Sequence, residues 1–247
     1  MPRGRLRGMC GRFTQQRPSA ELAALFAAED LAASPGGRFN LAPQQAGLVV
    51  VERDDLRRAI VPYRWGLIPS WAKDAKMGSR LINARAETVA TTPAFRASFA
   101  RRRCIVPADG FYEWERMTPE IRQPNLVRRV DGEPMAFAGL WSSWRDPAEP
   151  DAEPVRTFSI ITTSANATLA PIHDRMPVIL PSSAWEAWLA PAPAEPGELL
   201  ALLAPAPDDL LVRFPVSRRV NNVRNEGPEL VVPLGPTGPG PEPLLPA

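Results

Sequence analysis

Short segments with alternating hydrophobic and polar positions, or with unbroken apolar runs, cover most of the chain between residues 47 and 216. Segments of this length that are rich in β-branched and aromatic residues are typical of strands. Turn residues such as Gly, Pro, Asp and Asn separate them. The pattern predicts strands at residues 47–52, 58–65, 103–107, 110–114, 125–129, 135–144, 157–163 and 211–216.

A sparser pattern, in which apolar residues are three or four positions apart, predicts a few short helices. In the first of these, Leu22, Leu25 and Phe26 share one face, and Ser19 stands at the N-cap position. Residues 39–45 are expected to form a loop. The predicted helices span residues 19–30, 95–100 and 182–189.

Two turn dipeptides connect predicted strands. Asp109-Gly110 separates 103–107 from 110–114 and predicts a tight hairpin. Asp131-Gly132 leads into the strand at 135–144, which we expect to continue the same sheet. No linker divides the chain into two cores, so the predicted fold class is α+β, a single domain. We expect a mostly antiparallel β-sheet with a barrel-like core and a few flanking short helices.

Composition narrows the class of protein. No apolar run reaches the roughly 18 residues of a membrane span, so no membrane partner is expected. Two cysteines do not suggest a disulfide framework, and a reducing cytoplasm is the predicted location. The net charge of +2 argues against a surface coated for nucleic acid. Arginines, which suit phosphate, nevertheless form local clusters at 101–103, 128–129 and 218–219.

The segment from Met9 to Thr14, with the sequence MCGRFT, looks like a second beginning of the chain. If Met9 is the start, or if the residues before Cys10 are removed, Cys10 carries a free α-amine beside its thiol. The ordinary pKa values are about 8 for the amine and about 8.5 for the thiol, so both have nucleophilic forms near neutral pH. An aldehyde condenses with the amine, and the thiol then closes a five-membered thiazolidine ring. The alternative is a buried, inert cysteine, which is the usual fate of this residue type.

The single histidine, His173, lies in a loop between Pro171 and Pro177, with Asp174 and Arg175 beside it. Histidine titrates near neutrality, so this setting favours a positioned proton-transfer group. A lone histidine is more often a surface or capped structural residue. The sequence pattern alone leaves the two interpretations about equal.

Two further groups carry possible chemistry. On the strand at 110–114, Glu113 shares one face with Phe111, so it is either a solvated side chain or a buried acid in a site. Asn83 and Arg85 are two positions apart in an extended segment and lie on one face. Such a pair can orient a phosphate and a sugar oxygen, or it can belong to an interior network.

Seven segments of the chain carry a combined pattern: 9–13 (MCGRF), 40–43 (NLAP), 65–71 (WGLIPSW), 82–87 (INARAE), 107–114 (PADGFYEW), 172–177 (IHDRMP) and 216–223 (VSRRVNNV). Taken together, they resemble the SRAP family, the SOS response-associated peptidase-like proteins. The family includes bacterial and mammalian sensors of abasic sites in single-stranded DNA. The resemblance runs in order from Cys10 to about Pro233.

The resemblance implies a mechanism at an abasic deoxyribose. Glu113 would promote opening of the sugar ring, and the amine of Cys10 would attack C1′ to form an imine before the thiol closes the thiazolidine. His173 would shuttle protons, and Asn83 would hold the sugar and the terminal amine. This is lyase-type imine chemistry, and the thiazolidine would protect the site from strand cleavage.

The resemblance also implies how DNA is held. Arg12, Arg85 and Arg175 match positions expected to grip phosphates, and Pro43 and Trp71 lie in loops expected to wedge or stack at flanking bases. The expected partner is single-stranded DNA containing abasic sites. No cofactor or metal is expected, and the predicted state is a cytoplasmic monomer that joins the nucleoid when bound to DNA.

The main departure from the family pattern is the segment before Cys10, because the family places this cysteine directly after the initiator Met. We therefore predict three parts: a leader at 1–9 that is absent from the active protein, an SRAP domain at 10–233 and a Pro-rich disordered tail at 234–247. A second departure is Glu115, where the family often has a basic residue.

Two other functions remain open at this point. In the first, the chain is a cysteine peptidase that processes itself, with Cys10 attacking the preceding peptide bond while His173 and Glu113 assist. In the second, it is a non-covalent nucleic-acid-binding module whose affinity depends on salt and not on abasic sites. Abasic-site cross-linking is preferred because it gives a role to every candidate group.

Overall fold

The computed structural model describes residues 11–53, 55–191 and 195–235. Cys10 and the predicted leader at 1–9 lie outside the described residues. Most of the predicted tail, from residue 236 onward, lies outside them as well.

Strands dominate the described chain, and the helices are short, as the hydrophobic pattern predicts. No helix in these ranges has both the length and the apolar composition needed to cross a membrane. The α-helices are α1 (Ser19–Phe26), α2 (Arg96–Arg101), α3 (Trp185–Leu189) and α4 (Pro196–Ala201), and the 3-10 helices are η1 (Ala75–Arg80), η2 (Ser182–Ala184), η3 (Arg218–Asn221) and η4 (Pro228–Val231). The strands are β1 (Phe13–Gln15), β2 (Ala28–Asp30), β3 (Arg38–Leu41), β4 (Ala46–Glu52), β5 (Arg58–Trp65), β6 (Asn83–Arg85), β7 (Arg103–Ala108), β8 (Gly110–Arg116), β9 (Arg122–Arg129), β10 (Met135–Trp144), β11 (Val155–Ser164), β12 (Arg175–Pro177) and β13 (Leu211–Pro215).

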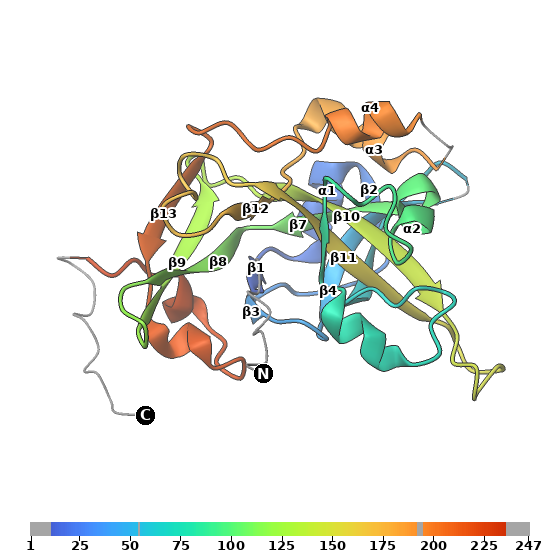
Figure 1. Cartoon of the computed structure of the whole chain (residues 1–247), viewed down its shortest axis with the longest axis horizontal. Coiled ribbons are helices and arrows are strands. Elements are labelled where there is room, and N and C mark those ends of the chain that lie inside the picture. The colour runs from blue at the N-terminus through green and yellow to red at the C-terminus, as the bar shows by residue number, and fades with distance from the viewer. Residues whose placement is uncertain (1–10, 54, 192–194, 236–247) are drawn as a thin grey trace.

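The strands form two sheets, which Figure 1 shows side by side with α3 and α4 above the larger one. The smaller sheet has the order β13-β9-β8-β1-β3. The larger has the order β12-β11-β10-β7-β4-β5-β2, with β6 added beside β11. Because β11 pairs with both β10 and β5, this sheet closes on itself. Most pairs are antiparallel, with parallel pairs between β2 and β5 and from β11 to β5 and β6. The predicted fold class is confirmed.

The two turns that we expected to join neighbouring strands are instead crossings between the sheets. The predicted hairpin at Asp109-Gly110 is wrong, since β7 pairs with β10 and β4, whereas β8 pairs with β9 and β1. The Asp131-Gly132 turn likewise leads from β9 in one sheet to β10 in the other. The Asp109 carboxylate accepts hydrogen bonds from Gln16 N (2.5 Å) and Arg17 Nε (2.9 Å), which hold the first crossing in place.

The predicted helix over 19–30 is too long, and its expected cap is wrong. The helix α1 ends at Phe26, Ala27 adopts the left-handed conformation (φ 50°), and the chain continues as β2 beside β5. Pro18 occupies the N-cap position, and the Ser19 hydroxyl donates to Asp30 Oδ2 at 2.7 Å instead. Sheet pairing therefore outweighs the helical pattern at 28–30. The expected loop over 39–45 also begins as a strand, β3, which pairs with β1.

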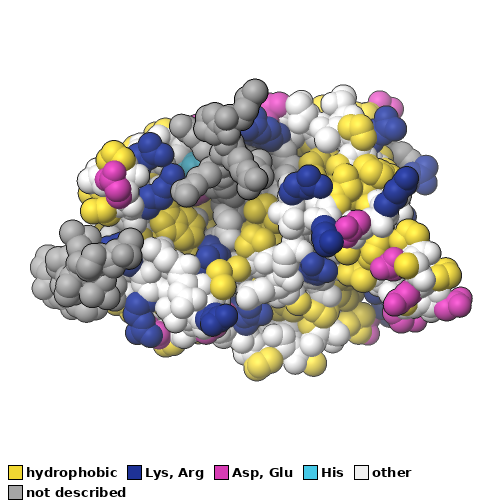
Figure 2. Space-filling view, turned by 60° about the horizontal axis from the view of Figure 1, so that its bottom comes forward, with side chains coloured by type: hydrophobic (Ala, Val, Ile, Leu, Met, Phe, Trp, Pro, Cys, Tyr) yellow, Lys and Arg dark blue, Asp and Glu magenta, His cyan; other side chains and the backbone are white. Residues whose placement is uncertain are grey.

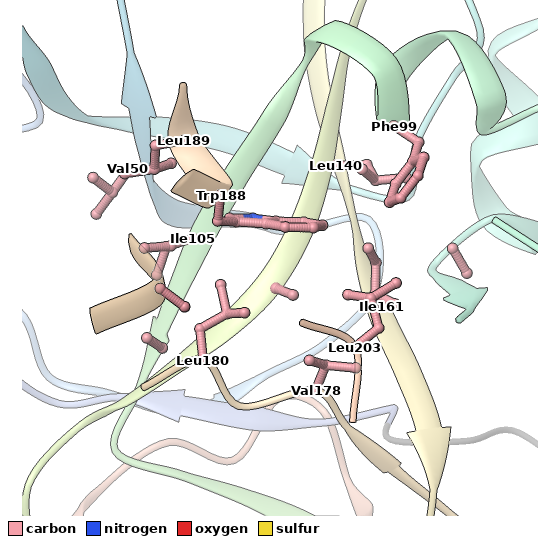
Figure 3. Close-up of a cluster of buried hydrophobic side chains, with 14 of the residues drawn as sticks. Val50, Phe99, Ile105, Leu140, Ile161, Val178, Leu180, Trp188, Leu189 and Leu203 are labelled. Carbon is pink, nitrogen blue, oxygen red and sulfur yellow. The ribbon is translucent and has the colours of Figure 1, made fainter. Parts of the chain in front are cut away.

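The largest core cluster packs the helices against one face of the larger sheet. Figure 3 shows Trp188 at its centre, with Phe99 and Leu140 toward one end of the indole and Ile105 toward the other. The Trp188 indole N–H donates to the Cys104 carbonyl oxygen at 2.9 Å, so the buried polar atom is satisfied. This anchor explains why the segment predicted as a helix over 182–189 lies on the sheet.

A buried amide, the side chain of Gln15, joins the two sheets. In the register of β4 and β7, Val50 pairs with Ile105, which places Leu48 opposite Pro107. Pro107 has no N–H, so the ladder between these strands cannot continue. Gln15 Nε2 donates to the carbonyl oxygens of Leu48 and Pro107, both at 2.8 Å, and its Oε1 accepts from Leu48 N at 2.8 Å. The side chain thus replaces the missing ladder bonds.

We predict that Gln15→Leu lowers the free energy of unfolding by about 3 kcal/mol, because two buried carbonyls and one buried N–H lose their partner. Urea denaturation at neutral pH measures the change. Gln16→Leu is the matched control, since the Gln16 amide donates only to the Thr14 hydroxyl (3.1 Å) and is half-buried. A loss for Gln15→Leu no larger than that for the control would contradict the bridging role.

Candidate functional site

The strand β1 brings the start of the described chain beside Glu113. Phe13 pairs with Phe111 on β8, and Tyr112 N donates to the Arg12 carbonyl oxygen at 3.0 Å. Continuing this antiparallel register places Gly11 across from Glu113. The first described residue is therefore next to one of the predicted catalytic side chains.

A cleft of about 690 Å³ opens at this point. Residues distant in sequence meet there: Arg12 from just before β1, Glu113 and Trp114 from β8, and His173 from the loop before β12. Three of the predicted site residues, Arg12, Glu113 and His173, thus share one cavity. Figure 2 shows a face of the molecule on which Lys and Arg side chains are spread and a small part of the histidine is visible.

Glu113 is 2% exposed. Of the two alternatives that the sequence left open for this carboxyl, a solvated side chain or a buried one, the structure shows the buried one. Its strand alternates as expected: Phe111 packs into the core between the sheets, while Tyr112 and Trp114 pack against residues of the C-terminal segment. Burial raises the pKa of the Tyr112 hydroxyl, which donates to the Phe39 carbonyl oxygen at 2.8 Å. The neighbouring strand residues therefore lock the backbone that carries Glu113.

The loop around His173 orients the imidazole ring. His173 N donates to the Leu169 carbonyl oxygen at 2.9 Å, and Nδ1 accepts from Arg175 N at 3.0 Å. In the neutral ring the proton is then on Nε2, which is the nitrogen left to exchange protons with a bound molecule. Asp174 Oδ1 lies 3.2 Å from Nδ1 and is able to pair with it only when that nitrogen is protonated. Because the Asp174 side chain is 87% exposed, this contact is weak.

Arg12 is built into the cleft wall. Its guanidinium donates to Asn40 Oδ1 (2.8 Å), to the Val220 carbonyl oxygen (2.7 Å) and to the Asn221 carbonyl oxygen (3.3 Å). It also lies over the Trp114 ring, 5.9 Å from the centroid. Burial lowers the pKa of Arg12. The hydrogen bonds to carbonyl oxygens stabilise the buried positive charge. Arg12 therefore fastens η3 to the start of β1.

Asn83, Arg85 and Arg175 lie on neighbouring strands of the larger sheet and do not line the cleft. On β11, Ile160 pairs with Asn83, Thr162 pairs with Arg85, and Ser164 pairs with Arg175. The two arginines flank Glu87, whose pKa is lowered chiefly by a hydrogen bond from Arg175 and further by the positive charge of Arg85. Arg85 is exposed, whereas the Arg175 guanidinium is mostly buried in a two-pronged contact with Glu87.

The two residues expected to contact bases lie in separate loops. Trp71 is 57% exposed and lies beside Lys73, Lys76 and Arg80. Pro43 is half-buried in the turn between β3 and β4, where Gln44 adopts a positive φ of 73°. An exposed indole among cations has the composition of a surface that stacks bases and attracts phosphates. The roles of both residues stay predictions.

Sequence reasoning missed two residues that shape the cleft. Asn40 is fully buried, and its Nδ2 donates to the carbonyl oxygens of Val220, Asn222 and Asn225. Asn221 accepts a 2.8 Å hydrogen bond from the Trp114 indole N–H at its Oδ1. Both belong to segments that carry the family resemblance, and that is the only sequence feature that distinguishes them.

The second cysteine has no reactive character. Cys104 is fully buried in β7, and burial raises the pKa of its thiol well above the usual range. A thiol held in this form is a poor nucleophile. Among the residues that the structure describes, no group of three or more His, Cys, Asp or Glu side chains is placed to hold a metal ion.

Comparison with known proteins identifies the family of the chain. The model of the family SOS response associated peptidase (SRAP) matches residues 9–223. The chain is 40% identical over 227 residues to the abasic site processing protein YoqW of Bacillus subtilis (strain 168), covering 90% of this chain and 99% of that protein. It is 35% identical over 233 residues to the abasic site processing protein YedK of Escherichia coli (strain K12), covering 92% and 100%.

The same fold occurs in a solved structure of a protein from Bacteroides thetaiotaomicron, with a TM-score of 0.81 at 24% identity. The match covers 91% of this chain and 99% of that one. Since the family model spans most of the chain, the protein belongs to the SRAP family.

The ion pair between Glu87 and Arg175 yields a prediction for stability against pH. The pKa of Glu87 is lowered from 4.5 in the folded protein, so its contribution is present above the unfolded pKa and is lost as pH falls through the folded pKa. Glu87→Gln should lower the free energy of unfolding by roughly 0.5 kcal/mol near pH 7, a small value because the Glu87 side chain is 52% exposed.

The difference between wild type and Glu87→Gln should shrink as the pH falls below 4.5, which urea denaturation near pH 7 and at a pH below 4.5 measures. Glu153→Gln serves as the control, because Glu153 is exposed and makes no ion pair within the described ranges. A difference that persists unchanged at the lower pH would rule out this linkage.

Proposed function

We propose that this protein processes abasic sites in single-stranded DNA and captures them covalently through Cys10, as a thiazolidine, when Cys10 is the first residue of the chain. The names of its relatives support the abasic-site substrate. The cross-linking chemistry is supported by one observation above all, the register of β1 on β8, which places Gly11 across from the buried Glu113.

The proposal requires the α-amine and the thiol of Cys10 to act in the cleft beside Gly11. Cys10 is bonded to Gly11, and consecutive Cα atoms are about 3.8 Å apart. In the proposal, the α-amine and the thiol of this residue act on a sugar bound in the cleft that holds Glu113 and His173. In this proposal residues 1–9 are absent from the active protein, because any preceding residue converts the amine into an amide.

The reaction balances with the loss of one water. The abasic deoxyribose is a cyclic hemiacetal, and Glu113 gives a proton to the ring oxygen as the C1′ hydroxyl loses one, which opens the ring to an aldehyde. The Cys10 amine adds to C1′, and the resulting carbinolamine expels water to form an imine. The thiol then adds across the imine bond, with sulfur bonding to C1′ and a proton passing to nitrogen. Capture as a thiazolidine prevents β-elimination from the imine.

His173 and Asn83 have supporting roles in the proposal. With Nδ1 held by Arg175 N, the Nε2 atom of His173 moves protons during addition and loss of water. Asn83 holds the sugar and the terminal amine. The role of Asn83 needs the DNA to run from the cleft over β6, since Asn83 does not line the cleft.

The proposed DNA path is held by charge and by stacking. Arg85 presents an exposed guanidinium to the phosphates, and Arg12 adds positive charge from the cleft wall. Arg175 is the third arginine assigned to the phosphates in this proposal, and in the free protein it is paired with Glu87. Trp71 and Pro43 meet the bases on either side of the abasic nucleotide.

Cross-linking should depend on the free amine and on the Cys10 thiol together. A version of the chain that begins at Met9, with Met9 removed in the cell, should form a heat-stable adduct with a single-stranded oligonucleotide carrying one abasic site. The adduct mass should equal protein plus DNA minus one water. Cys10→Ala, or the full chain with residues 1–9 retained, should bind the oligonucleotide without forming this adduct.

Cys104→Ala is the control for cysteine chemistry in general, and it should cross-link like the parent because Cys104 is buried. Equal adduct yields from Cys10→Ala and the parent would refute the proposal. Intact-mass measurement of the full chain and of its Cys10→Ala form also tests self-processing, which requires that removal of residues 1–9 depend on Cys10.

Glu113→Gln should slow cross-linking by about 100-fold or more at saturating oligonucleotide, because the amide retains the shape of the carboxyl but transfers no proton to the sugar. Quenched time courses on denaturing gels measure the rate. Glu115→Gln is the matched control, since Glu115 lies two positions further on the same strand, pairs with Arg213 at 3.5 Å and does not line the cleft. Equal rates for the two variants would remove Glu113 from the mechanism.

A further inference from the structure

A second cleft, of about 600 Å³, continues from the reaction cleft past Trp114. The two share Trp114, Arg116, Arg122 and Asn221, so a chain molecule is able to pass from one into the other. Arg218, on η3, lines only the second cleft. None of the interactions described so far explains why three arginines converge there.

Two of these arginines face each other without compensation. Arg116 on β8 and Arg122 on β9 are directly opposite in the antiparallel register, and both are exposed. Like charges in this position repel and destabilise the pair of strands. Neither side chain forms an ion pair with any residue that the structure describes. An anion lying between them would turn the repulsion into two attractions.

The third arginine has a polar atom with no partner. Arg218 Nε is buried and has no hydrogen-bond acceptor in the described part of the chain. Its neighbour Arg219 pairs with Glu229 at 3.4 Å, whereas the buried Nε of Arg218 on the same short helix has no such partner. A buried N–H group without an acceptor carries an energetic cost that a bound anion would remove.

The lining residues have an excess of positive charge. Glu120 is the carboxylate among them, and its Oε2 accepts a hydrogen bond from the Thr118 hydroxyl at 3.2 Å. Three guanidinium groups therefore face one carboxylate. The Trp114 ring, held by Asn221, forms the boundary between the two clefts and offers an aromatic surface to a passing base.

We propose that Arg116, Arg122 and Arg218 form a phosphodiester-binding subsite that holds the DNA backbone on one side of the abasic nucleotide. One phosphate bridges Arg116 and Arg122, and a phosphate oxygen accepts the hydrogen bond from Arg218 Nε. The subsite rests on the proposed function for its ligand, since the strand enters from the reaction cleft. It makes binding directional: one flank of the abasic site lies against these arginines and the other flank does not.

Binding of unmodified single-stranded oligonucleotide, measured by fluorescence anisotropy over a range of salt, tests the subsite without any covalent step. Arg122→Gln and Arg218→Gln should each weaken binding several-fold and reduce the slope of log K against log salt by about 0.7. Arg219→Gln is the matched control, because Arg219 is adjacent, exposed and already paired. Its slope should equal that of the parent. Parental slopes in both test variants would overturn the subsite.

The thermal stability of the free protein separates this role from a structural one. Removing one of two repelling charges should leave the midpoint of Arg122→Gln equal to or above that of the parent, while its DNA affinity falls. A lower midpoint with unchanged affinity would assign Arg122 to the fold and overturn the subsite.

Oligonucleotides with an abasic site near one end test direction. The loss of affinity in Arg122→Gln should appear with only one of the two flanks, 5′ or 3′, and equal losses with both would overturn the one-sided arrangement. Inorganic phosphate at constant ionic strength distinguishes the ligand: if it raises the melting temperature of the parent but not of Arg122→Gln, while DNA binding is the same for both, the site takes free phosphate and the assignment to DNA fails.

Different results would refute the proposed cross-linking through Cys10 and the proposed arginine subsite. A parent chain beginning at Cys10 that shows the arginine-dependent salt slopes but forms no adduct would refute cross-linking and leave the subsite standing. A parent that forms the adduct, with parental slopes in both arginine variants, would do the opposite.

Discussion

The carboxamide of Gln15 is the interaction on which the rest of the structure depends. Pro107 interrupts the ladder between β4 and β7 because it has no N–H, and the side chain of Gln15 supplies the missing hydrogen bonds at that point. The amide is 2% exposed and satisfied on both its oxygen and its nitrogen. Since Gln15 belongs to β1 in the smaller sheet, the same contact fixes the position of that sheet on the larger one. A polar group in the core thereby sets the relative placement of the two halves of the fold.

Fixing β1 also fixes the reaction cleft. Gly11 lies across from Glu113 in the register of β1 and β8. The Arg12 guanidinium donates hydrogen bonds to Asn40 and to the Val220 carbonyl oxygen and lies over the Trp114 ring. The cleft wall is therefore assembled around the strand that follows Cys10. β1 is held between β3 and β8, so Gly11 and Arg12, which precede it, lie beside Glu113 and the C-terminal segment.

The hydrophobic pattern predicted which segments form strands but not which strands pair. Alternation over 110–116 defines the faces of β8 and is the same whether β7 or β9 lies alongside. Asp109-Gly110 is compatible with a hairpin, yet the hydrogen bonds of Asp109 to β1 turn the chain into the other sheet. The helical pattern extends over residues 28–30, but these residues form a strand that pairs with β5, and the local sequence does not indicate this pairing. Long-range partners decided each of these cases.

The candidate site was predictable to the extent that residue types limit its chemistry. The local sequence is compatible with either a solvated or a buried Glu113 side chain. The side chain is buried because β8 packs between β1 and β9, and this pairing is not visible in the local sequence. The same limit applies to the pairing of the arginines. The chain contains 29 Lys and Arg and 27 Asp and Glu, and the sequence does not indicate which of them form ion pairs. Arg17 and Arg175 meet carboxylates within the protein, whereas Arg116 and Arg122 face each other. The net charge of +2 therefore does not reveal how charge is distributed, because some arginines are paired within the protein while Arg116 and Arg122 face each other.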